Sequence, residues 1–245
     1  MIDNLETIKQ KIKEAKAIVY FGGAGTSTES EIPDFRTESG LYNQPEFAGR
    51  DPQVLLSTRT LYNEPELFYA YYRSHRLFPN AKPNKAHKVL ARWEQEGKLK
   101  AVITQNIDGL HQMAGSQNVL ELHGSVHRNY CTECQQQAEL DEITDSSQKI
   151  PLCRHCGGML RPDVVFFGEP LDQNILHQAV KALKASDFLI VGGTSLVVYP
   201  AAGLIDYFEG KNMLLINRDK TPFDNRATWV IHDSIGEVLW QLAEV

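Results

Sequence analysis

Polar side chains with catalytic potential gather in the stretch 103–124. Gln105, Asn106 and Asp108 follow an apolar run, and His123 ends an alternating one. Ligands of open α/β sheets bind where strands end, so amide, carboxylate and imidazole groups at these positions predict a site for hydrogen bonding and proton transfer. A pair of capped turns would use the same residue types, and this stretch alone favours neither interpretation.

A glycine-rich turn at 22–28 directly follows the apolar run 17–21, which has the character of a strand buried on both faces. Small residues there let the backbone approach a phosphate, and amides at a following helix start could bind it. The turn fits the dinucleotide fingerprint of dehydrogenases poorly. Thr28 stands where the third glycine belongs, and no acidic residue ends a second strand about twenty residues later. A turn without a ligand remains the alternative.

The four cysteines of the chain form two Cys-x-x-Cys pairs, Cys131 with Cys134 and Cys153 with Cys156, separated by eighteen residues. Thiolates at this spacing predict a structural Zn2+ site, since they complete a tetrahedral shell and leave no position for a catalytic water. Disulfides are the alternative, but a chain without a signal sequence favours thiolates. The intervening segment is polar, so we expect the metal to supply much of its stability.

The composition is that of a globular protein: 245 residues, 42% of them hydrophobic, with a net charge of −6. This balance argues against nucleic acid and anionic membranes as partners. The uncharged span 188–205 is near the lower limit for a bilayer span, but Gly192, Gly193 and Pro200 interrupt it. We interpret it as a buried strand, a tight turn and a helix start, and we expect a cytoplasmic protein.

Strand patterns alternate with helical ones along the chain, which predicts a mostly parallel sheet covered on both faces. Asn84 and Asp172 are expected to cap two of the helices, and Ser234 with Glu237 forms a capping-box pattern before the last one. Two insertions interrupt the alternation: an aromatic, proline-rich segment at 37–83 and the cysteine segment. The predicted strands are 17–21, 100–104, 119–122, 188–191, 213–216 and 228–231.

The order of the motifs resembles the sirtuin family of NAD-dependent protein deacylases, in its compact prokaryotic form. The resemblance runs from about residue 17 to the C-terminus. The matching motifs are Gly23-Ala24-Gly25-Thr26-Ser27, Ile32-Pro33-Asp34-Phe35-Arg36, Thr104-Gln105-Asn106-Ile107-Asp108, Leu122-His123-Gly124, the cysteine quartet, Arg161-Pro162-x-Val164-Val165-Phe166-Phe167-Gly168-Glu169 and Gly193-Thr194-Ser195-Leu196.

The resemblance implies a deacetylase that transfers the acetyl group of acetyl-lysine to ADP-ribose. The acyl oxygen attacks C1′ of the nicotinamide ribose, nicotinamide leaves, and the 2′-hydroxyl then takes the acyl group, which gives 2′-O-acetyl-ADP-ribose. His123 matches the base for that hydroxyl, and Asn106 matches the residue that orients the ribose and a water. Asp108 and Ile107 match the nicotinamide contacts, and Gln105 matches a ribose contact.

The remaining implied contacts fall on the two glycine loops and the strand ends. Further cofactor contacts are implied for Ala24, Gly25, Thr28, Phe35, Arg36, Gly193, Thr194, Ser195, Asn217 and Ile235. Substrate peptide is expected to pair with Val164, Val165, Phe166 and Phe167 on one side and with 192–198 on the other.

The implied fold is a Rossmann-like doubly wound sheet with a small zinc-ribbon domain and a helical insertion. We assign 1–37, 84–124 and 162–245 to the NAD-binding domain, 38–83 to the helical insertion of the small domain and 125–161 to its zinc module. NAD as co-substrate, one structural Zn2+, acetyl-lysine proteins or peptides as partners and a monomeric state complete the expectation.

Two departures from the family pattern stand out. Glu31 occupies a position where the family usually has glycine, which bears on the conformation of the cofactor loop. Desuccinylating members carry a Tyr-x-x-Arg pair, whereas here Tyr69 and Tyr72 take the comparable positions and Arg73 follows one residue later. Because one helical residue rotates a side chain by about 100°, we expect Arg73 to point elsewhere and neutral acyl groups to be preferred.

Three other functions compete with this reading. An NAD-dependent dehydrogenase would share the sheet and cofactor, but it would need an intact fingerprint and an acidic ribose ligand. A zinc-ribbon nucleic-acid module would need a basic, aromatic-interleaved surface. Mono-ADP-ribosyl transfer is the nearest alternative, because it cleaves the same bond of the same cofactor.

Overall fold

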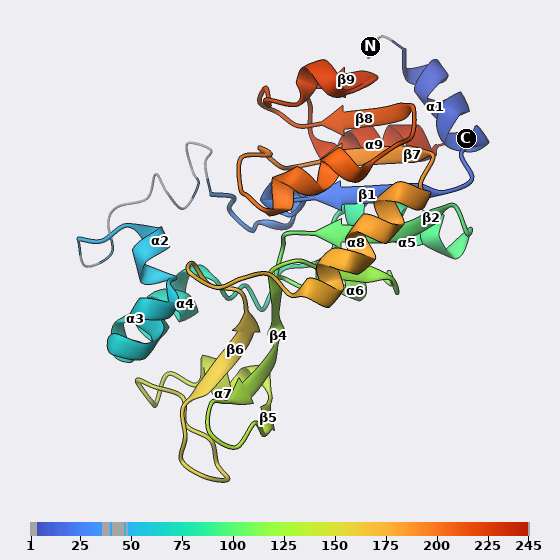
Figure 1. The fold of residues 1–245 in the computed structure, drawn as a ribbon. Coiled ribbons are helices and arrows are strands. Elements are labelled where there is room, and N and C mark those ends of the chain that lie inside the picture. The colour runs from blue at the N-terminus through green and yellow to red at the C-terminus, as the bar shows by residue number, and fades with distance from the viewer. Residues whose placement is uncertain (1–3, 36–39, 41–46, 48, 245) are drawn as a thin grey trace.

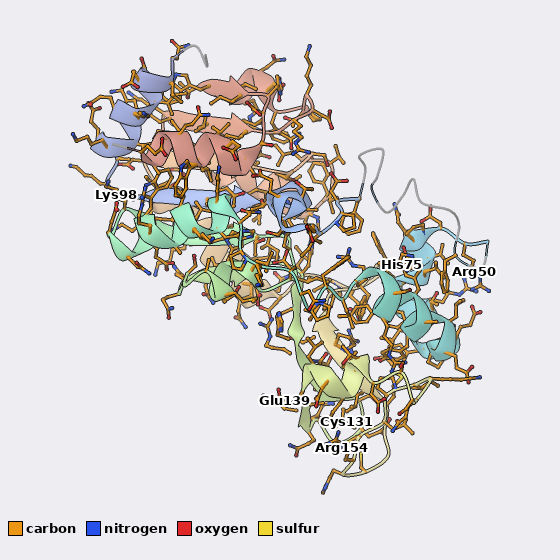
Figure 2. The ribbon with its side chains drawn as sticks, turned by 180° about the vertical axis from the view of Figure 1, so that it is seen from behind. Arg50, His75, Lys98, Cys131, Glu139 and Arg154 are labelled. Atoms are coloured by element: carbon orange, nitrogen blue, oxygen red, sulfur yellow. The ribbon has the colours of Figure 1, made fainter. Side chains whose placement is uncertain are left out.

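The computed structural model describes residues 4–35, 40, 47 and 49–244 (Figure 1). It has two sheets, a six-stranded one that carries most of the helices and a three-stranded one at the opposite end of the molecule. Figure 2 shows Lys98 beside the large sheet and Cys131 in the small one, toward opposite ends of the molecule. The cleft between these regions is where the predicted site residues lie.

The large sheet has the strand order β3-β2-β1-β7-β8-β9, and every neighbouring pair is parallel. The chain therefore starts in the middle, builds outward through β2 and β3, and returns to the other side of β1 with β7. Sheets of this order bind ligands at the switch point, here the carboxyl ends of β1 and β7. The strands are β1 (Ile18–Gly22), β2 (Leu99–Thr104), β3 (Val119–Glu121), β7 (Phe188–Gly192), β8 (Asn212–Ile216) and β9 (Trp229–Ile231).

Helices cover both faces of this sheet, as the alternating pattern predicted. On one face α1 (Leu5–Glu14), α5 (Lys85–Gln95) and α9 (Ile235–Ala243) form an apolar cluster with the strands. On the other face α8 (Gln173–Ala185) and the 3-10 helix η4 (Ala201–Tyr207) form a second cluster. The central strands β1 and β7 are buried along their whole length, which explains their continuous apolar sequences.

The smaller region combines both insertions around a third apolar cluster. Aromatic residues of α4, including Phe68 and Tyr72, pack there with Leu160, Val164 and Phe166. Its antiparallel sheet has the order β5-β4-β6. The elements are α2 (Pro52–Leu55), α3 (Thr58–Asn63), α4 (Pro65–His75), β4 (Gly124–Cys131), β5 (Gln137–Ala138), α7 (Leu140–Thr144) and β6 (Leu160–Val164).

Two of the three predicted helix caps are confirmed. The side chain of Asn84 accepts from the backbone of α5 in a capping box, and Asp172 accepts from two amides of α8. The capping box predicted at Ser234 is wrong, because its side chain makes no cap bond. Its hydroxyl instead meets Arg218 at 3.0 Å, and the Gly236 amide donates to the Glu29 carboxylate at 2.9 Å. The Glu29 carboxylate, which is distant in the sequence, thus accepts the hydrogen bond of a first-turn amide of α9 in place of a local cap.

The uncharged span 188–205 is a strand, a turn and a helix start, as predicted. β7 ends at Gly192, and η4 begins at Ala201. Across the described residues, we find no helix with the length and apolar character needed to traverse a membrane.

Glu31 adopts the left-handed conformation, with φ 64° and ψ 19°, directly after the 3-10 helix η2 (Thr28–Ser30). Glycine enters this region without steric cost, whereas a residue with a Cβ does not. The loop therefore has the conformation that a glycine would favour, and the departure from the family pattern is accommodated as local strain.

Replacing Glu31 with glycine is expected to raise the free energy of unfolding by about 0.5–1 kcal/mol, since relief of the left-handed strain exceeds the added entropy of the unfolded chain. Urea unfolding at pH 7 measures the change. Glu31→Ala is the matched control, because alanine removes the carboxylate but keeps the Cβ. Equal stabilisation by both variants would show that the side chain, not the backbone, is responsible.

Two histidines are buried side by side between α5 and α6 (Leu110–Met113). His87 on α5 and His111 on α6 are 0% and 1% exposed, and their ring centroids are 4.7 Å apart. Nε2 of His87 and both ring nitrogens of His111 have no hydrogen-bond partner among the described residues. Burial lowers the pKa of His87 to about 4, although the Asp108 charge opposes the shift, and burial lowers the pKa of His111 as well.

These histidines predict acid sensitivity. Below pH 6.5 these two histidines bind protons in the unfolded chain but stay neutral in the folded one. The free energy of unfolding therefore falls as the pH falls, by at most about 1.4 kcal/mol per pH unit for each histidine. The window for His87 runs from pH 6.5 down to about 4. Urea unfolding at pH 7, 6 and 5 tests this, and His111→Leu should flatten the dependence by about half. His177→Leu, which removes an exposed histidine, is the control and should keep the wild-type pH dependence of the unfolding free energy. The same pH dependence in His111→Leu as in this control would contradict the assignment.

Candidate functional site

A cleft of about 560 Å³ opens at the carboxyl ends of β1, β2 and β7 and continues along the smaller region. A small hollow of about 40 Å³ extends it toward the end of β8 and shares Gly25, Gly193 and Asn217 with it. Together they bring nearly all of the predicted cofactor and peptide residues to one place. The predicted residues that line them are Ala24, Gly25, Thr28, Phe35, Gln105, Asn106, Ile107, Asp108, His123, Val164, Val165, Phe166, Phe167, Gly193, Thr194, Ser195, Asn217 and Ile235.

The two glycine loops form the middle of the cleft and pack backbone against backbone. The Gly25 amide donates to the Gly193 carbonyl at 2.8 Å, and the Gly23 amide donates to Gly192 at 3.2 Å. A Cβ on Gly25 would lie 2.8 Å from Gly193 Cα, and Gly193 itself has φ 58°. Close packing of the loops therefore requires these glycines, whether or not a phosphate binds over them. The packing also fixes both loops at the switch point of the sheet.

A hydrogen-bonded network holds the polar turn after β2. Ser27 Oγ donates to Asp108 Oδ2 at 2.7 Å, and Asn106 Nδ2 donates to Ser27 Oγ at 3.0 Å. Asp108 Oδ1 accepts from the Leu110 amide at 3.0 Å, so the carboxylate is fixed at both oxygens. Gln105 Nε2 reaches across to Thr194 Oγ1 at 3.1 Å. The turn is thus tied to both glycine loops.

His123 lines the same cleft and follows β3. Its Nδ1 is 2.9 Å from the Gln105 carbonyl oxygen. A carbonyl only accepts, so Nδ1 carries the proton and Nε2 of the neutral ring is left as an acceptor. Burial lowers the pKa of His123, the Arg76 charge adds to the effect, and the bond to Gln105 opposes it. The imidazole is therefore neutral at pH 7 and able to take a proton.

The end of the cleft beside β8 is formed by Asn217 and the start of α9. The Asn217 side chain donates to the Asp219 carbonyl at 2.7 Å. Ile235 is buried against Gly192, where a Cβ would lie 1.9 Å from Ile235 Cδ1. Glycine at 192 thus makes room for Ile235, which forms part of the floor of the small hollow.

The backbone amides of the predicted peptide wall, residues 164–167, donate hydrogen bonds to acceptors within the chain. Val165 donates to the His123 carbonyl and Phe167 to the Leu56 carbonyl, both at 3.0 Å. The Phe166 amide donates to Glu169 at 2.9 Å, and Arg161 holds that carboxylate at 2.9 and 3.1 Å. The carbonyls of Phe166 and Phe167 also accept hydrogen bonds within the chain, from the Glu169 and Thr58 amides, both at 3.0 Å.

Arg73 points away from the cleft, as predicted. Its guanidinium donates to the Ile143 and Gln148 carbonyls, both at 2.7 Å, and so joins α4 to the zinc module. Tyr72, by contrast, lines the cleft, and Arg76 lies there one turn further along. Sequence analysis had named Tyr72 only as a comparable position, and it missed Arg76.

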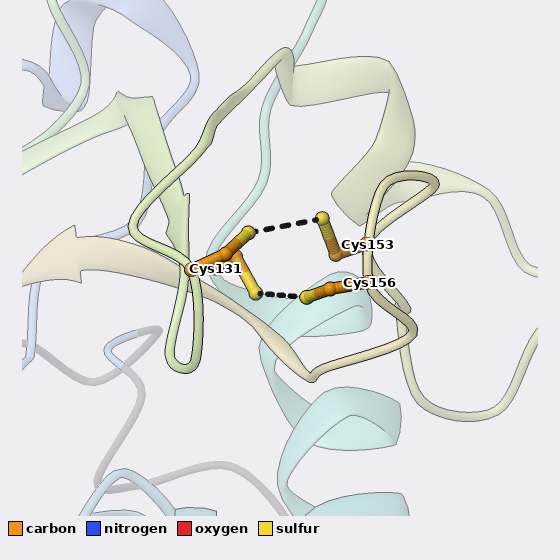
Figure 3. Close-up of side chains that lie close together, drawn as sticks. Cys131, Cys153 and Cys156 are labelled. Carbon is orange, nitrogen blue, oxygen red and sulfur yellow. Dashed lines mark hydrogen bonds between the residues drawn. The ribbon is translucent and has the colours of Figure 1, made fainter.

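The four cysteines form a cluster away from the cleft, at the tips of the small sheet (Figure 3). All four sulfurs lie within 4.8 Å of one another, and Cys131–Cys156 and Cys134–Cys153 are 3.4 and 3.8 Å apart. Four thiolates 2.3 Å from one Zn2+ would be about 3.8 Å apart, so the cluster fits the ion. These separations are too long for disulfides, which need about 2.05 Å. The set would supply four ligands and leave no open position.

Sequence analysis also missed two residues that the geometry brings into the site. Ser27 bridges Asn106 and Asp108, and its place inside a glycine-rich turn gave no sign of this contact. Glu29 joins η2, which follows the first glycine loop, to α9, a contact across 207 positions. The predicted contact Arg36 lies outside the described residues.

Comparisons with known proteins agree with this geometry. The model of the Sir2 family matches residues 23–200. An NAD-dependent protein deacetylase of Clostridium acetobutylicum is 53% identical over 98% of both chains, and one of Clostridium perfringens is 51% identical over the full length of both. A solved structure described as Sir2-p53 peptide-NAD+ is 39% identical, with a TM-score of 0.85 over 96% of this chain and 95% of that one. The chain belongs to the Sir2 family, the sirtuins.

Proposed function

We propose that this protein is an NAD-dependent protein lysine deacetylase that releases nicotinamide and forms 2′-O-acetyl-ADP-ribose. The observation that carries the proposal is the convergence, in one cleft, of a neutral His123 with the network of Asn106, Asp108 and Ser27. The relatives at about 50% identity are NAD-dependent protein deacetylases, and one structural neighbour is described as Sir2 bound to acetylated peptide.

The cleft suits an elongated dinucleotide. It runs from the carboxylate and amides beside β2, over two glycine loops, to Asn217 beside β8. Asp108 and Ile107 would bind the nicotinamide, and Asn106 and Gln105 would bind its ribose. The glycine loops would hold the diphosphate, and Asn217 with Ile235 the adenosine. Phe35 would shield the reacting face, and Arg36, which lies outside the described residues, would approach the phosphate or the ribose.

NAD supplies the ribose carbon to which the acyl oxygen is joined as nicotinamide leaves. The residues of the chain orient the reactants and move one proton. Nε2 of His123 would accept the proton of the ribose 2′-hydroxyl, while the Gln105 carbonyl holds the ring in the tautomer that this requires. Asp108, fixed through Ser27 and the Leu110 amide, would accept hydrogen bonds from the carboxamide.

We further propose that the acyl-lysine enters between the wall Val164–Phe167 and residues 192–198. We also propose that the sequence-based division into NAD-binding, helical and zinc parts describes the domains. The third apolar cluster, which packs the aromatic residues of α4 against Cys131, Cys153 and Leu160, supports grouping the helical insertion with the zinc module. A monomeric state and a cytoplasmic location remain sequence-based predictions.

Incubation with NAD and an acetyl-lysine peptide tests the proposal. Nicotinamide release should require the acetylated peptide and should match deacetylated peptide one to one. Release without the peptide would indicate hydrolysis or transfer to another acceptor, and ADP-ribosylated protein in the mass spectrum would favour the mono-ADP-ribosyltransferase alternative. Hydride transfer to NAD from any substrate would instead support a dehydrogenase.

A further inference from the structure

The side chain of Asn84 makes hydrogen bonds both to its own helix and to the first glycine loop, residues 22–28. Its Oδ1 accepts from the Ala86 amide at 2.9 Å, which caps α5. Its Nδ2 donates to the Thr26 carbonyl at 2.8 Å, a contact across 58 positions. An N-cap needs only an oxygen acceptor, so serine or aspartate would cap α5 about equally well. Capping therefore does not account for the amide nitrogen.

Thr26 is the residue through which the loop is held on its buried side. Its neighbours Gly25 and Ser27 line the cleft, whereas Thr26 between them is 0% exposed. The Thr26 hydroxyl lies 2.7 Å from the hydroxyl of Tyr20, on β1. The bond from Asn84 holds the carbonyl of the same residue, so side chain and backbone are both fixed.

The bond to the Thr26 carbonyl also bears on the polar network of the cleft. A carbonyl shares one planar peptide unit with the next amide, so holding the Thr26 oxygen fixes the plane from which Ser27 starts. Ser27 Oγ donates to Asp108 at 2.7 Å and accepts from Asn106 at 3.0 Å. The contact made by Asn84 is thus one residue away from the network that would surround the nicotinamide ribose.

The segment η2, which directly follows the loop, is held at the start of a second helix. The Gly236 amide, in the first turn of α9, donates to the Glu29 carboxylate at 2.9 Å. Lys85, next to Asn84, forms an ion pair with Glu237 at 2.6 Å, so the first turns of α5 and α9 are joined to each other. Both helices pack on the large sheet in the first apolar cluster. The loop and η2 are therefore attached to one rigid support.

We infer that Asn84 is a positioning residue for the NAD site, because its Nδ2 keeps the first glycine loop in the conformation over which the diphosphate would bind. Asn84 is not one of the described residues that line the cleft or the small hollow, so it acts through Thr26 and not on the cofactor. Without this bond the loop would adopt other conformations for part of the time, and the apparent affinity for NAD would fall with the competent fraction. The inference rests on the proposed function and adds a residue to its NAD site.

Two substitutions of Asn84 remove the donor and keep a capping oxygen. Asn84→Asp has the same shape but sets an oxygen against the Thr26 carbonyl, and Asn84→Ser offers a hydroxyl too short to replace the amide. Calorimetric titration should show a Kd for NAD about two- to tenfold higher in both variants, the usual effect of one hydrogen bond. At saturating NAD, kcat for an acetyl-lysine peptide and the KM of that peptide should stay at the wild-type values, since bound NAD restores the loop.

Two controls separate positioning from helix stability. Lys85→Gln removes the ion pair to Glu237 at the adjacent position and leaves the loop contact in place. Asp172→Ala removes the cap of α8, which does not contact the loop, and should lower the melting temperature. Neither control should change the Kd for NAD. A Kd raised equally in Asp172→Ala and in the Asn84 variants would overturn the inference, because loss of stability alone would then explain the effect.

Hydrogen exchange of the protein without NAD tests the loop contact directly. The Thr26 and Ser30 amides donate within the loop and η2, and they should exchange faster in Asn84→Asp than in the wild type. Saturating NAD should remove the difference. Unchanged exchange, or faster exchange with an unchanged Kd for NAD, would overturn the inference. A wild-type protein that binds NAD but leaves acetyl-lysine intact would overturn the proposed function alone, and one that binds no NAD would overturn both.

Discussion

His123→Ala is expected to lower kcat for deacetylation by about 10²–10⁴-fold, the usual contribution of a positioned general base. The Gln105 carbonyl accepts from Nδ1, so Nε2 alone can take the proton of a substrate hydroxyl. Alanine removes that acceptor without touching the network of Ser27, Asn106 and Asp108. Affinity for NAD should therefore change far less than kcat, which stopped-flow or calorimetric titration of NAD can show.

The pH profile distinguishes a base from a structural histidine. Burial lowers the pKa of His123, so the wild-type kcat should hold from neutral pH into mildly acid solution and fall only as the pH passes below that lowered value. The residual kcat of His123→Ala should not show this fall at acid pH. The control His177→Ala removes an exposed imidazole of α8 and should keep both the rate and the profile. A full rate in His123→Ala would exclude the assignment.

The sequence predicted the sheet well because its central strands are buried on both faces and are therefore continuous apolar runs. All six predicted strands, including the alternating one at 119–122, are strands of the large sheet. Local patterns also identified the caps at Asn84 and Asp172. The cap at Ser234 failed because a long-range contact from Glu29 replaced the local one, and no short window of sequence contains both residues.

The site shows the same division between local and long-range information. Residues within motifs, such as Gln105, Asp108 and His123, were predicted because each motif has a recognisable type and spacing. Tyr72 and Arg76 come from an aromatic helix whose residues could have been core or lid, and only packing decides which face lines the cleft. The role of Ser27 depends on a contact across 81 positions. Side chains that act through tertiary contacts carry no local sequence pattern.

Cys134→Ser is expected to abolish stable zinc binding and to unfold the module that carries the cysteines. Cys134 is exposed, so a sulfur-to-oxygen change there would alter stability by less than about 0.5 kcal/mol if the residue had no metal to hold. With Zn2+ bound, the loss removes one of four ligands from a segment whose folding depends on the metal, and apparent zinc affinities of such sites are about 10–16 kcal/mol. The zinc content measured by metal analysis should fall from one ion per chain to well below one.

Unfolding of the zinc module in Cys134→Ser should also disrupt the cleft, because the metal site and the peptide wall share one apolar cluster. Cys131 and Leu160 are buried together with Phe166, and β6 runs directly from the cysteines into Val164. We therefore expect rapid proteolysis within 125–161 and loss of deacetylation, while the large sheet keeps its cooperative unfolding. Glu133→Gln, an exposed neighbour that offers no sulfur, should change none of these properties. Retained zinc and activity in Cys134→Ser would show that the quartet is not the metal site.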